Sequence, residues 1–376
     1  MTLDELSALV DTMPERGIPC FDLSVYRDGE EVYRRMAGYA DHAKTKPVGP
    51  STLYWIFSAS KVMTCVAAAR LLEEGRIRLD DPVSRYLPSF AELSVAEKDG
   101  SVHPCEVPMT LEHLFTMTGG LDYDLNAPGI AREIASGKAT TVSVCAAIPE
   151  KPLHFVPGTH YLYSLGHDVL GAIVEIVSGM RFSEYLNRIM WEPLGMAETG
   201  FSPLGREDRI AEEYRFSNGR GVALPIPTGS PFALCPGFES GGGGILTTVN
   251  DYMQMISALS RGGTAKNGYR LLKPETVALF ESNRLPPAAL NDFVSGRLWG
   301  YGWGLCGRVH MNPTYSLSRS PVGEFGWDGA AGAYASVDRK NRLAFFIGTA
   351  VHNGVYLYNW LHPLIRNAVY DALGVA

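Results

Sequence analysis

The sequence lacks the short motifs that mark many cofactor-dependent and metal-dependent enzymes. It has no phosphate-binding loop ending in Gly-Lys-Ser/Thr, which argues against a nucleotide site of that kind. No His-Glu-x-x-His occurs and the nine histidines show no ligand spacing, so we expect no metal site. A Gly-x-Ser-x-Gly is also missing, which argues against a nucleophile elbow. Any chemistry must come from side chains in another arrangement, and we expect no cofactor.

Long hydrophobic runs and concentrated positive charge are also missing. No run of about 18 apolar residues occurs, so no membrane span is expected. The net charge is −7 and basic side chains are scattered, so no nucleic-acid partner is expected. The first residues carry no cationic start or cleavage site, and the six cysteines form no Cys-x-x-Cys pair. We therefore expect a cytoplasmic protein with free thiols; its oligomeric state is not readable from the sequence.

Strand patterns lie near the two ends of the chain, and helical patterns fill its middle. Alternating apolar residues indicate a strand at 19–27, and strand-like segments follow at 32–39, 331–337 and 343–351. Apolar residues at helical spacing indicate helices at 62–74, 168–177, about 183–189 and about 355–373. We expect Ser183 to cap the third helix and Pro363 to kink the last. Distant parts of the chain would then form one sheet, with the helical middle as an insertion and a site between the two.

The most informative pattern is the tetrapeptide Ser58-Ala59-Ser60-Lys61, which begins the first helical stretch. Residues three apart on a helix share a face, so the Ser58 hydroxyl and the Lys61 amine are expected to meet. A hydroxyl beside an uncharged amine is an activated nucleophile. The same pattern also fits an N-cap serine with a solvated lysine, so it needs further context.

Two further segments carry residues suited to the same chemistry. In residues 157–168 a turn delivers Tyr163 to the start of a helix, where its phenol would relay a proton beside Lys61. Residues 323–332 are rich in glycine and lead into a strand, so the Ala330 N–H is placed to form an oxyanion hole with that of Ser58. Taken singly, each segment also fits a structural role: a buried tyrosine bonded to backbone, and a loop feeding an edge strand.

Together these segments resemble the serine hydrolases of the class C β-lactamase and penicillin-binding-protein group, and within it the family VIII carboxylesterases. Residues 79–88, 109–121, 192–196 and 241–251 resemble further segments of that group, so the resemblance covers roughly residues 20–350. It implies an α/β (α+β), β-lactamase-like fold with a central antiparallel sheet, flanking terminal helices and a mainly helical inserted lobe. The sheet domain would hold 1–67 and 295–376 with part of 175–230; the helical domain would hold roughly 68–174 and 231–294.

The resemblance also assigns roles. Ser58 would be the nucleophile and Lys61 the general base, for which its pKa must fall well below about 10.4. Tyr163 would relay the proton to the leaving alcohol, and the N–H groups of Ser58 and Ala330 would hold the oxyanion. Residues 241–244 would be a loop in the wall of the site.

Departures from the β-lactamase pattern favour esters over β-lactams. Trp327 stands where those enzymes have the cation that attracts the substrate carboxylate, and Asp328 beside it would repel an anion. Leu165 replaces the asparagine that orients an amide side chain. Both changes fit a neutral, partly apolar ester. We expect a pocket formed by Tyr123, Leu165, Asp168, Trp327, Asp328 and Gly329, with Asp168 bonding to the site indirectly. Most other nearby aromatic residues are expected in the core: Phe155, Trp299, Tyr301, Trp303 and Phe325.

We therefore expect a serine esterase acting on a small-molecule ester through an acyl-enzyme. A β-lactamase, D-aminopeptidase or acyltransferase on the same fold is the first alternative. A non-catalytic ligand-binding protein is the second, although such a protein need not keep Ser58, Lys61 and Tyr163 together. The sequence does not give the natural substrate, its chain length or its stereochemistry.

Overall fold

The computed structural model, which describes residues 1–295 and 298–375, centres on an antiparallel sheet built from both ends of the chain. Its strand order is β2-β1-β13-β12-β11-β10-β9, and every neighbouring pair is antiparallel. The strands are β1 (Cys20–Arg27), β2 (Glu30–Gly38), β9 (Tyr301–Trp303), β10 (Arg308–His310), β11 (Phe325–Gly326), β12 (Tyr334–Asp338) and β13 (Leu343–Thr349). The predicted sheet of distant segments is confirmed.

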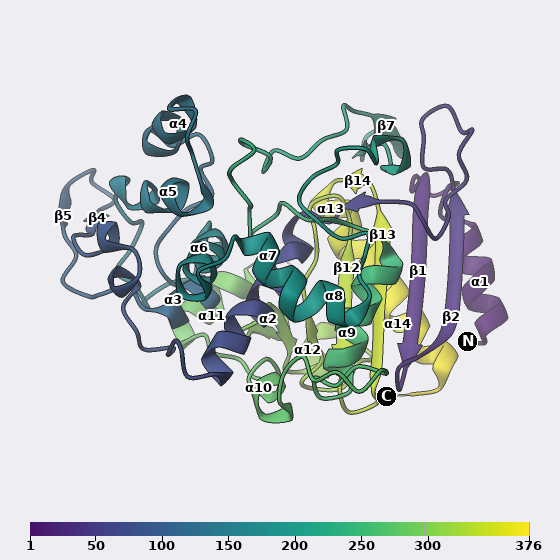
Figure 1. The fold of residues 1–376 in the computed structure, drawn as a ribbon. Helices are drawn as coiled ribbons and strands as arrows, with labels where there is room; N and C mark the ends of the chain where they lie inside the picture. The colour runs from purple at the N-terminus through teal and green to yellow at the C-terminus, as the bar shows by residue number, and fades with distance from the viewer. Residues whose placement is uncertain (296–297, 376) are drawn as a thin grey trace.

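Helices cover both faces of the sheet, and the side chains of its central strand β13 point alternately to the two faces. Phe345 and Ile347 of β13 pack with α1 (Leu3–Asp11) and α14 (His362–Leu373), the helices at the two ends of the chain. Ala344 and Phe346 face the other way, toward α9 (Val249–Ser260). Figure 1 shows α1 and α14 on the side of the sheet away from the helical part of the chain.

The middle of the chain forms the helical part of the molecule, seen at the left of Figure 1. Its first helix, α2 (Ser60–Glu73), is buried around most of its circumference and packs against α6 (Gly166–Ser178). The other α-helices, in this part and later in the chain, are short: α3 (Leu111–Phe115), α4 (Pro128–Ala135), α5 (Thr141–Ala146), α7 (Phe182–Leu186), α8 (Glu192–Leu194), α10 (Pro274–Ala278), α11 (Pro287–Val294), α12 (Pro313–Ser316) and α13 (Gly354–Tyr356).

Small sheets also occur beside the main sheet. They comprise β3 (Tyr54–Trp55) with β8 (Leu246–Thr247), β4 (Ser94–Ala96) with β5 (Val102–Pro104), and β14 (Val351–His352) with β6 (Tyr214–Ser217) and β7 (Val222–Pro225). The largest apolar cluster is continuous, running from Phe346 of the sheet through Val62 of α2 to Val144 of α5. Packing therefore does not mark the boundary between the two predicted domains, and their division stays a prediction.

Most predicted elements are found within a few residues, and two details differ. The N-cap of α7 is Arg181. Ser183 lies within the helix and its hydroxyl donates to Glu239, so the predicted Ser183 cap is wrong. The last helix is not one regular α-helix: a π-helical turn, Leu357–Leu361, precedes α14, whose second residue is Pro363, and the predicted kink at that proline stays a prediction. Proline has no N–H to continue the α-helical ladder. Across the described part of the chain, no helix is long and apolar enough to cross a membrane.

Candidate active site

A cavity of about 450 Å³ lies where the turn that carries Ser58, the helical part and the late strands meet. Six of its lining residues come from the three segments singled out in the sequence: Ser58, Tyr161, Tyr163, Trp327, Asp328 and Ala330. The full lining is Ser58, Tyr123, Tyr161, Tyr163, Phe232, Phe293, Ser295, Leu298, Trp327, Asp328, Ala330 and Tyr358. The structure thus brings the three predicted segments together around one hollow of ligand size.

The serine and the lysine are presented by a sharp passage from strand to helix. Strand β3 ends at Trp55, a 3₁₀ turn covers Phe57–Ala59, and α2 begins at Ser60. Phe57 has a φ of +45°, a conformation rare for residues other than glycine and costly by about 1–3 kcal/mol. The turn leaves Ser58 half-buried at the cavity wall, with its Oγ 3.4 Å from the Nζ of Lys61.

Lys61 is fully buried, which changes its chemistry. Its Nζ donates to the carbonyl of Gly242 at 2.5 Å and lies 2.9 Å from the hydroxyl of Tyr123. Burial lowers the pKa of Lys61 to about 7, although the nearby Asp168 carboxylate acts in the opposite direction. A substantial fraction of Lys61 is therefore uncharged at neutral pH and able to accept a proton.

Two tyrosines flank this lysine. The rings of Tyr123 and Tyr163 stack with centroids 5.4 Å apart and planes 4° from parallel. The Nζ of Lys61 lies 5.0 Å from the first ring centroid and 4.6 Å from the second. Burial raises the pKa of both phenols. Hydrogen bonds with Ser58 lower the pKa of each phenol, but by less than burial raises it. Both tyrosines therefore stay protonated near pH 7, where they can pass protons but cannot act as charged bases.

The glycine run at 241–244 holds the lysine in place. The Oδ1 of Asp168 accepts hydrogen bonds from the Ser240 hydroxyl at 2.5 Å and from the Gly242 N–H at 3.1 Å. A Cβ on Gly242 would lie 2.2 Å from Asp168 Oδ2, so only glycine allows this approach. Asp168 thus positions the loop whose carbonyl binds Lys61, but it does not line the cavity, which corrects its predicted place in the pocket.

Leu165 and Gly329 also lie outside the cavity lining, contrary to the pocket predicted from the sequence. Leu165 is 2% exposed within the main apolar cluster, and its N–H donates to the carbonyl of Asp122. Gly329 lies against Ile56, the residue before the turn that carries Ser58: a Cβ on Gly329 would come within 2.2 Å of the Ile56 carbonyl oxygen. Leu165 therefore supports the start of α6, and Gly329 allows two backbone segments to meet behind the site.

The late glycine-rich segment supplies the opposite wall. The indole N–H of Trp327 donates to the hydroxyl of Tyr163 at 2.9 Å, and its ring packs on Trp303 with centroids 4.5 Å apart. Asp328 lines the cavity with its Oδ2 3.8 Å from Nδ1 of His362. The Ala330 N–H has no hydrogen-bond partner among the described residues, and Ala330 is exposed in the cavity. A free N–H beside Ser58 is what an oxyanion hole requires.

Several lining residues were not found from the sequence. Phe232, Phe293, Ser295, Leu298 and Tyr358 lie in loops or helices with no motif, and folding alone brings them to the cavity. Tyr123 was expected in the pocket, but its contact with Lys61 was not predicted. Of the other aromatic residues, Tyr301, Trp303 and Phe325 are buried in the core as predicted, whereas Trp299 is 61% exposed.

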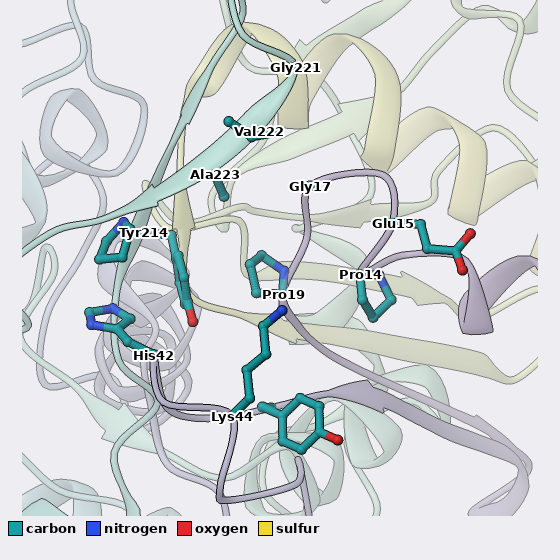
Figure 2. A pocket seen from close by; sticks show the side chains of 12 residues that line it. Pro14, Glu15, Gly17, Pro19, His42, Lys44, Tyr214, Gly221, Val222 and Ala223 are labelled. Atoms are coloured by element: carbon teal, nitrogen blue, oxygen red, sulfur yellow. The ribbon is translucent and has the colours of Figure 1, made fainter.

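A second hollow, of about 400 Å³, lies near the first strands (Figure 2). Its walls include Pro19, His42, Lys44 and Tyr214, and the Lys44 side chain extends between them (Figure 2). It contains no serine, and no lysine–tyrosine pair like that of the first cavity. Within the described residues, no group of three or more His, Cys, Asp or Glu side chains is arranged to hold a metal ion.

Comparison with known proteins agrees with this geometry. The chain matches the β-lactamase family over residues 6–357. Esterase EstB of Burkholderia gladioli is 30% identical over 370 residues, covering 92% of this chain and 89% of EstB. The acyltransferase calJ of Penicillium decumbens is 28% identical over 354 residues, covering 87% of this chain and 83% of calJ.

Among solved structures, EstCE1, described as a hydrolase with promiscuous acyltransferase activity, has a TM-score of 0.82 with 26% sequence identity and 98% of both chains covered. These matches confirm the resemblance and the β-lactamase-like fold that the sequence predicted. The chain therefore belongs to the β-lactamase family, and within it to the family VIII esterase-like serine hydrolases.

Proposed function

We propose that this protein is a carboxylesterase that hydrolyses neutral esters through an acyl-enzyme on Ser58. The observation that carries the proposal is the contact of Ser58 with a fully buried lysine whose pKa is lowered to about 7. A serine hydroxyl becomes an effective nucleophile only when a nearby base takes its proton. Lys61 is suited to that task near neutral pH, whereas the two protonated phenols are suited to proton relay.

In the proposed acylation step, Ser58 Oγ attacks the ester carbonyl carbon and its proton passes to Lys61. The N–H groups of Ser58 and Ala330 stabilise the negative charge that develops on the carbonyl oxygen. The bond to the alcohol oxygen then breaks, and Tyr163 delivers the proton to the leaving alcohol while Lys61 resupplies it. Water attacks the acyl-enzyme in the second step, loses its proton to the same groups, and releases the carboxylic acid and free Ser58.

The lining of the cavity supports an ester as substrate. Eight aromatic or aliphatic side chains surround Ser58: Tyr123, Tyr161, Tyr163, Phe232, Phe293, Leu298, Trp327 and Tyr358. The indole of Trp327 offers no charge to a substrate carboxylate, which β-lactams and D-alanyl peptides carry. Slow turnover of nitrocefin beside fast turnover of a p-nitrophenyl ester is the expected outcome.

Acyl transfer is the second candidate, and the apolar lining favours it because such walls bind an alcohol acceptor in place of water. The relative calJ is named an acyltransferase, and EstCE1 is described as a hydrolase with promiscuous acyltransferase activity. The ratio of ester to acid formed from p-nitrophenyl butyrate in the presence of butanol separates the two candidates. A ratio of product ester to acid well above the molar ratio of butanol to water would favour acyl transfer.

The main test compares the wild type with Ser58→Ala on p-nitrophenyl butyrate. Loss of the reacting oxygen is expected to lower kcat by about 10³-fold or more. Ser295→Ala is the matched control, because Ser295 lines the same cavity but its hydroxyl donates to the carbonyl of Asp292. Unchanged activity in Ser58→Ala would refute the mechanism, and a wild type without hydrolase activity would favour the ligand-binding alternative.

A further inference from the structure

A third cavity, of about 720 Å³, adjoins the catalytic one, and the two share a single lining residue, Phe232. Most of its other lining residues come from two loops, residues 200–204 after α8 and residues 233–244 between β7 and β8. They are Arg181, Ser183, Trp191, Gly200, Phe201, Ser202, Pro203, Leu204, Ala233, Leu234, Cys235, Pro236, Phe238, Glu239, Ser240 and Gly244. One aromatic side chain therefore stands between the space around Ser58 and a larger space behind it.

The third cavity is suited to an aliphatic chain. Its larger side chains are mainly apolar, with Trp191, Phe201, Leu234 and Phe238 among them. Its charged groups pair with each other: Arg181 binds Glu239 at 2.7 Å, and the same carboxylate accepts from the hydroxyl and the N–H of Ser183. A ligand group entering from the catalytic side thus meets hydrophobic surface, where each buried methylene adds favourable free energy.

Phe232 is held by ring packing between the catalytic groups and the glycine loop. Its ring meets Tyr123 edge-on at 5.9 Å and Phe57 at 6.3 Å between centroids. On the other side the ring covers Gly243, where a Cβ would lie 2.6 Å from it. Phe232 is 7% exposed and lines both cavities, so its buried side chain lies between them, at the position called the passage below.

The backbone around Phe232 has few restraints. In residues 229–234, all of them described, the hydrogen bonds made by N–H groups are local: Phe232 to the Ser230 hydroxyl and Ala233 to the Ser230 carbonyl. No strand or helix covers these residues. The ring is therefore kept in the passage by contacts that a substitution removes without breaking a helix or sheet.

We infer that Phe232 sets the chain-length limit of the ester pocket by separating it from the third cavity, which accepts the aliphatic chain of a longer ester only when the ring is removed. The inference rests on the proposed esterase function at Ser58. With the phenyl ring in place, a chain bound at Ser58 ends within the catalytic cavity. With the ring removed, the chain continues into the apolar space behind it.

The test measures kcat/KM for p-nitrophenyl butyrate and p-nitrophenyl dodecanoate, and uses their ratio as the readout. Phe232→Ala is expected to raise the dodecanoate-to-butyrate ratio about tenfold or more over the wild type, as added methylenes gain an apolar pocket. A second series, of butyl to dodecyl butyrates, tells whether the chain lies on the acyl or the alcohol side of the ester. A response in either series supports the inference, and no response in both overturns it.

Two further variants separate the opening of the passage from general loosening. Phe238→Ala removes an equal ring from the third cavity alone, so its ratio is expected to equal that of the wild type. Adding Ala233→Trp to Phe232→Ala refills the third cavity and is expected to restore the wild-type ratio. A ratio raised equally by Phe238→Ala, or left high by the added tryptophan, would overturn the inference.

Phe232→Leu is a milder variant for the case that Phe232→Ala does not fold. Leucine fills part of the passage, so the dodecanoate-to-butyrate ratio should lie between those of the wild type and Phe232→Ala. Loss of butyrate turnover in both Phe232 variants would also overturn the inference, since Phe232 would then support catalysis instead of limiting length. Ser58→Ala, run in the same series, keeps the two questions apart. Hydrolysis by that variant would refute the esterase mechanism, whereas an inactive Ser58→Ala with an unchanged Phe232→Ala ratio would refute only the chain-length role.

Discussion

At the scale of single residues, the state of Lys61 decides the chemistry. An amine on the surface is protonated at neutral pH and accepts nothing, whereas burial of Lys61 lowers its pKa to about 7. The unfolded chain, with an ordinary lysine pKa, binds more protons than the folded chain between about pH 7 and 10.5. The contribution of this group to stability therefore rises with pH across that window, and the buried charge destabilises the fold below it.

The same shift predicts the pH dependence of activity. As the pH falls through about 7, Lys61 gains a proton and can no longer accept one from Ser58. We expect kcat/KM for p-nitrophenyl butyrate to fall about tenfold per pH unit on the acidic side. A profile that stays flat between about pH 5.5 and 8.5 in the folded enzyme would show that another group is the base.

Trp327 gives a second prediction at this scale. Trp327→Phe keeps an aromatic ring but removes the indole N–H that donates to Tyr163 at 2.9 Å. The lost orientation of the phenol is expected to lower kcat about tenfold, with a smaller change in KM. Trp299→Phe serves as control, because that indole is 61% exposed and outside the cavity. Equal kcat values in the two variants would exclude this role for the indole.

At the scale of elements, the loop at 241–244 links Asp168 to Lys61, the proposed base. Gly242→Ala places a Cβ 2.2 Å from Asp168 Oδ2, so the loop must move and carry the carbonyl that binds Lys61 with it. We expect kcat to fall about 10²-fold while the far-ultraviolet circular dichroism stays native. Gly49→Ala, at a position with open space around it, should keep full activity. A fully active Gly242→Ala would remove the loop from the mechanism.

The elements also explain what the sequence could predict. Ser58 and Lys61 were paired from the sequence because a helical turn fixes the relation of residues three apart. Strand β1 was found because its apolar residues alternate, and β13 because it is a short apolar run that follows the turn at 338–341. The contact of Tyr123 with Lys61 spans 62 positions along the chain, and Phe232 lies in a loop without periodicity. Such contacts depend on how loops pack in three dimensions, which no local pattern encodes.

The pocket errors have the same cause. Leu165 was placed in the pocket because it stands at the asparagine position of the family motif, and Asp168 because family VIII esterases are similar in having a nearby aspartate. The start of α6 turns them away from the cavity: Leu165 packs into the core, and Asp168 points at the glycine loop. Family motifs therefore located the site to within a few residues, while the direction of each side chain required the structure.

At the scale of the whole molecule, the sheet joins residues that are more than three hundred positions apart, such as Phe21 of β1 and Thr349 of β13. The main apolar cluster also runs without a break from the sheet into the helical part. We therefore expect one unfolding transition in urea, at the same midpoint by tryptophan fluorescence, far-ultraviolet circular dichroism and loss of esterase activity. Two separated transitions would show that the helical part is an independent unit.

The central claim is that Ser58 forms the covalent intermediate, and mass spectrometry of the enzyme after reaction with an alkyl fluorophosphonate tests it most directly. The account predicts one phosphonyl adduct per chain, located on Ser58, formed faster above about pH 7 than below it and absent from Ser58→Ala. An adduct on another residue of the folded wild type, or none at all, would contradict it.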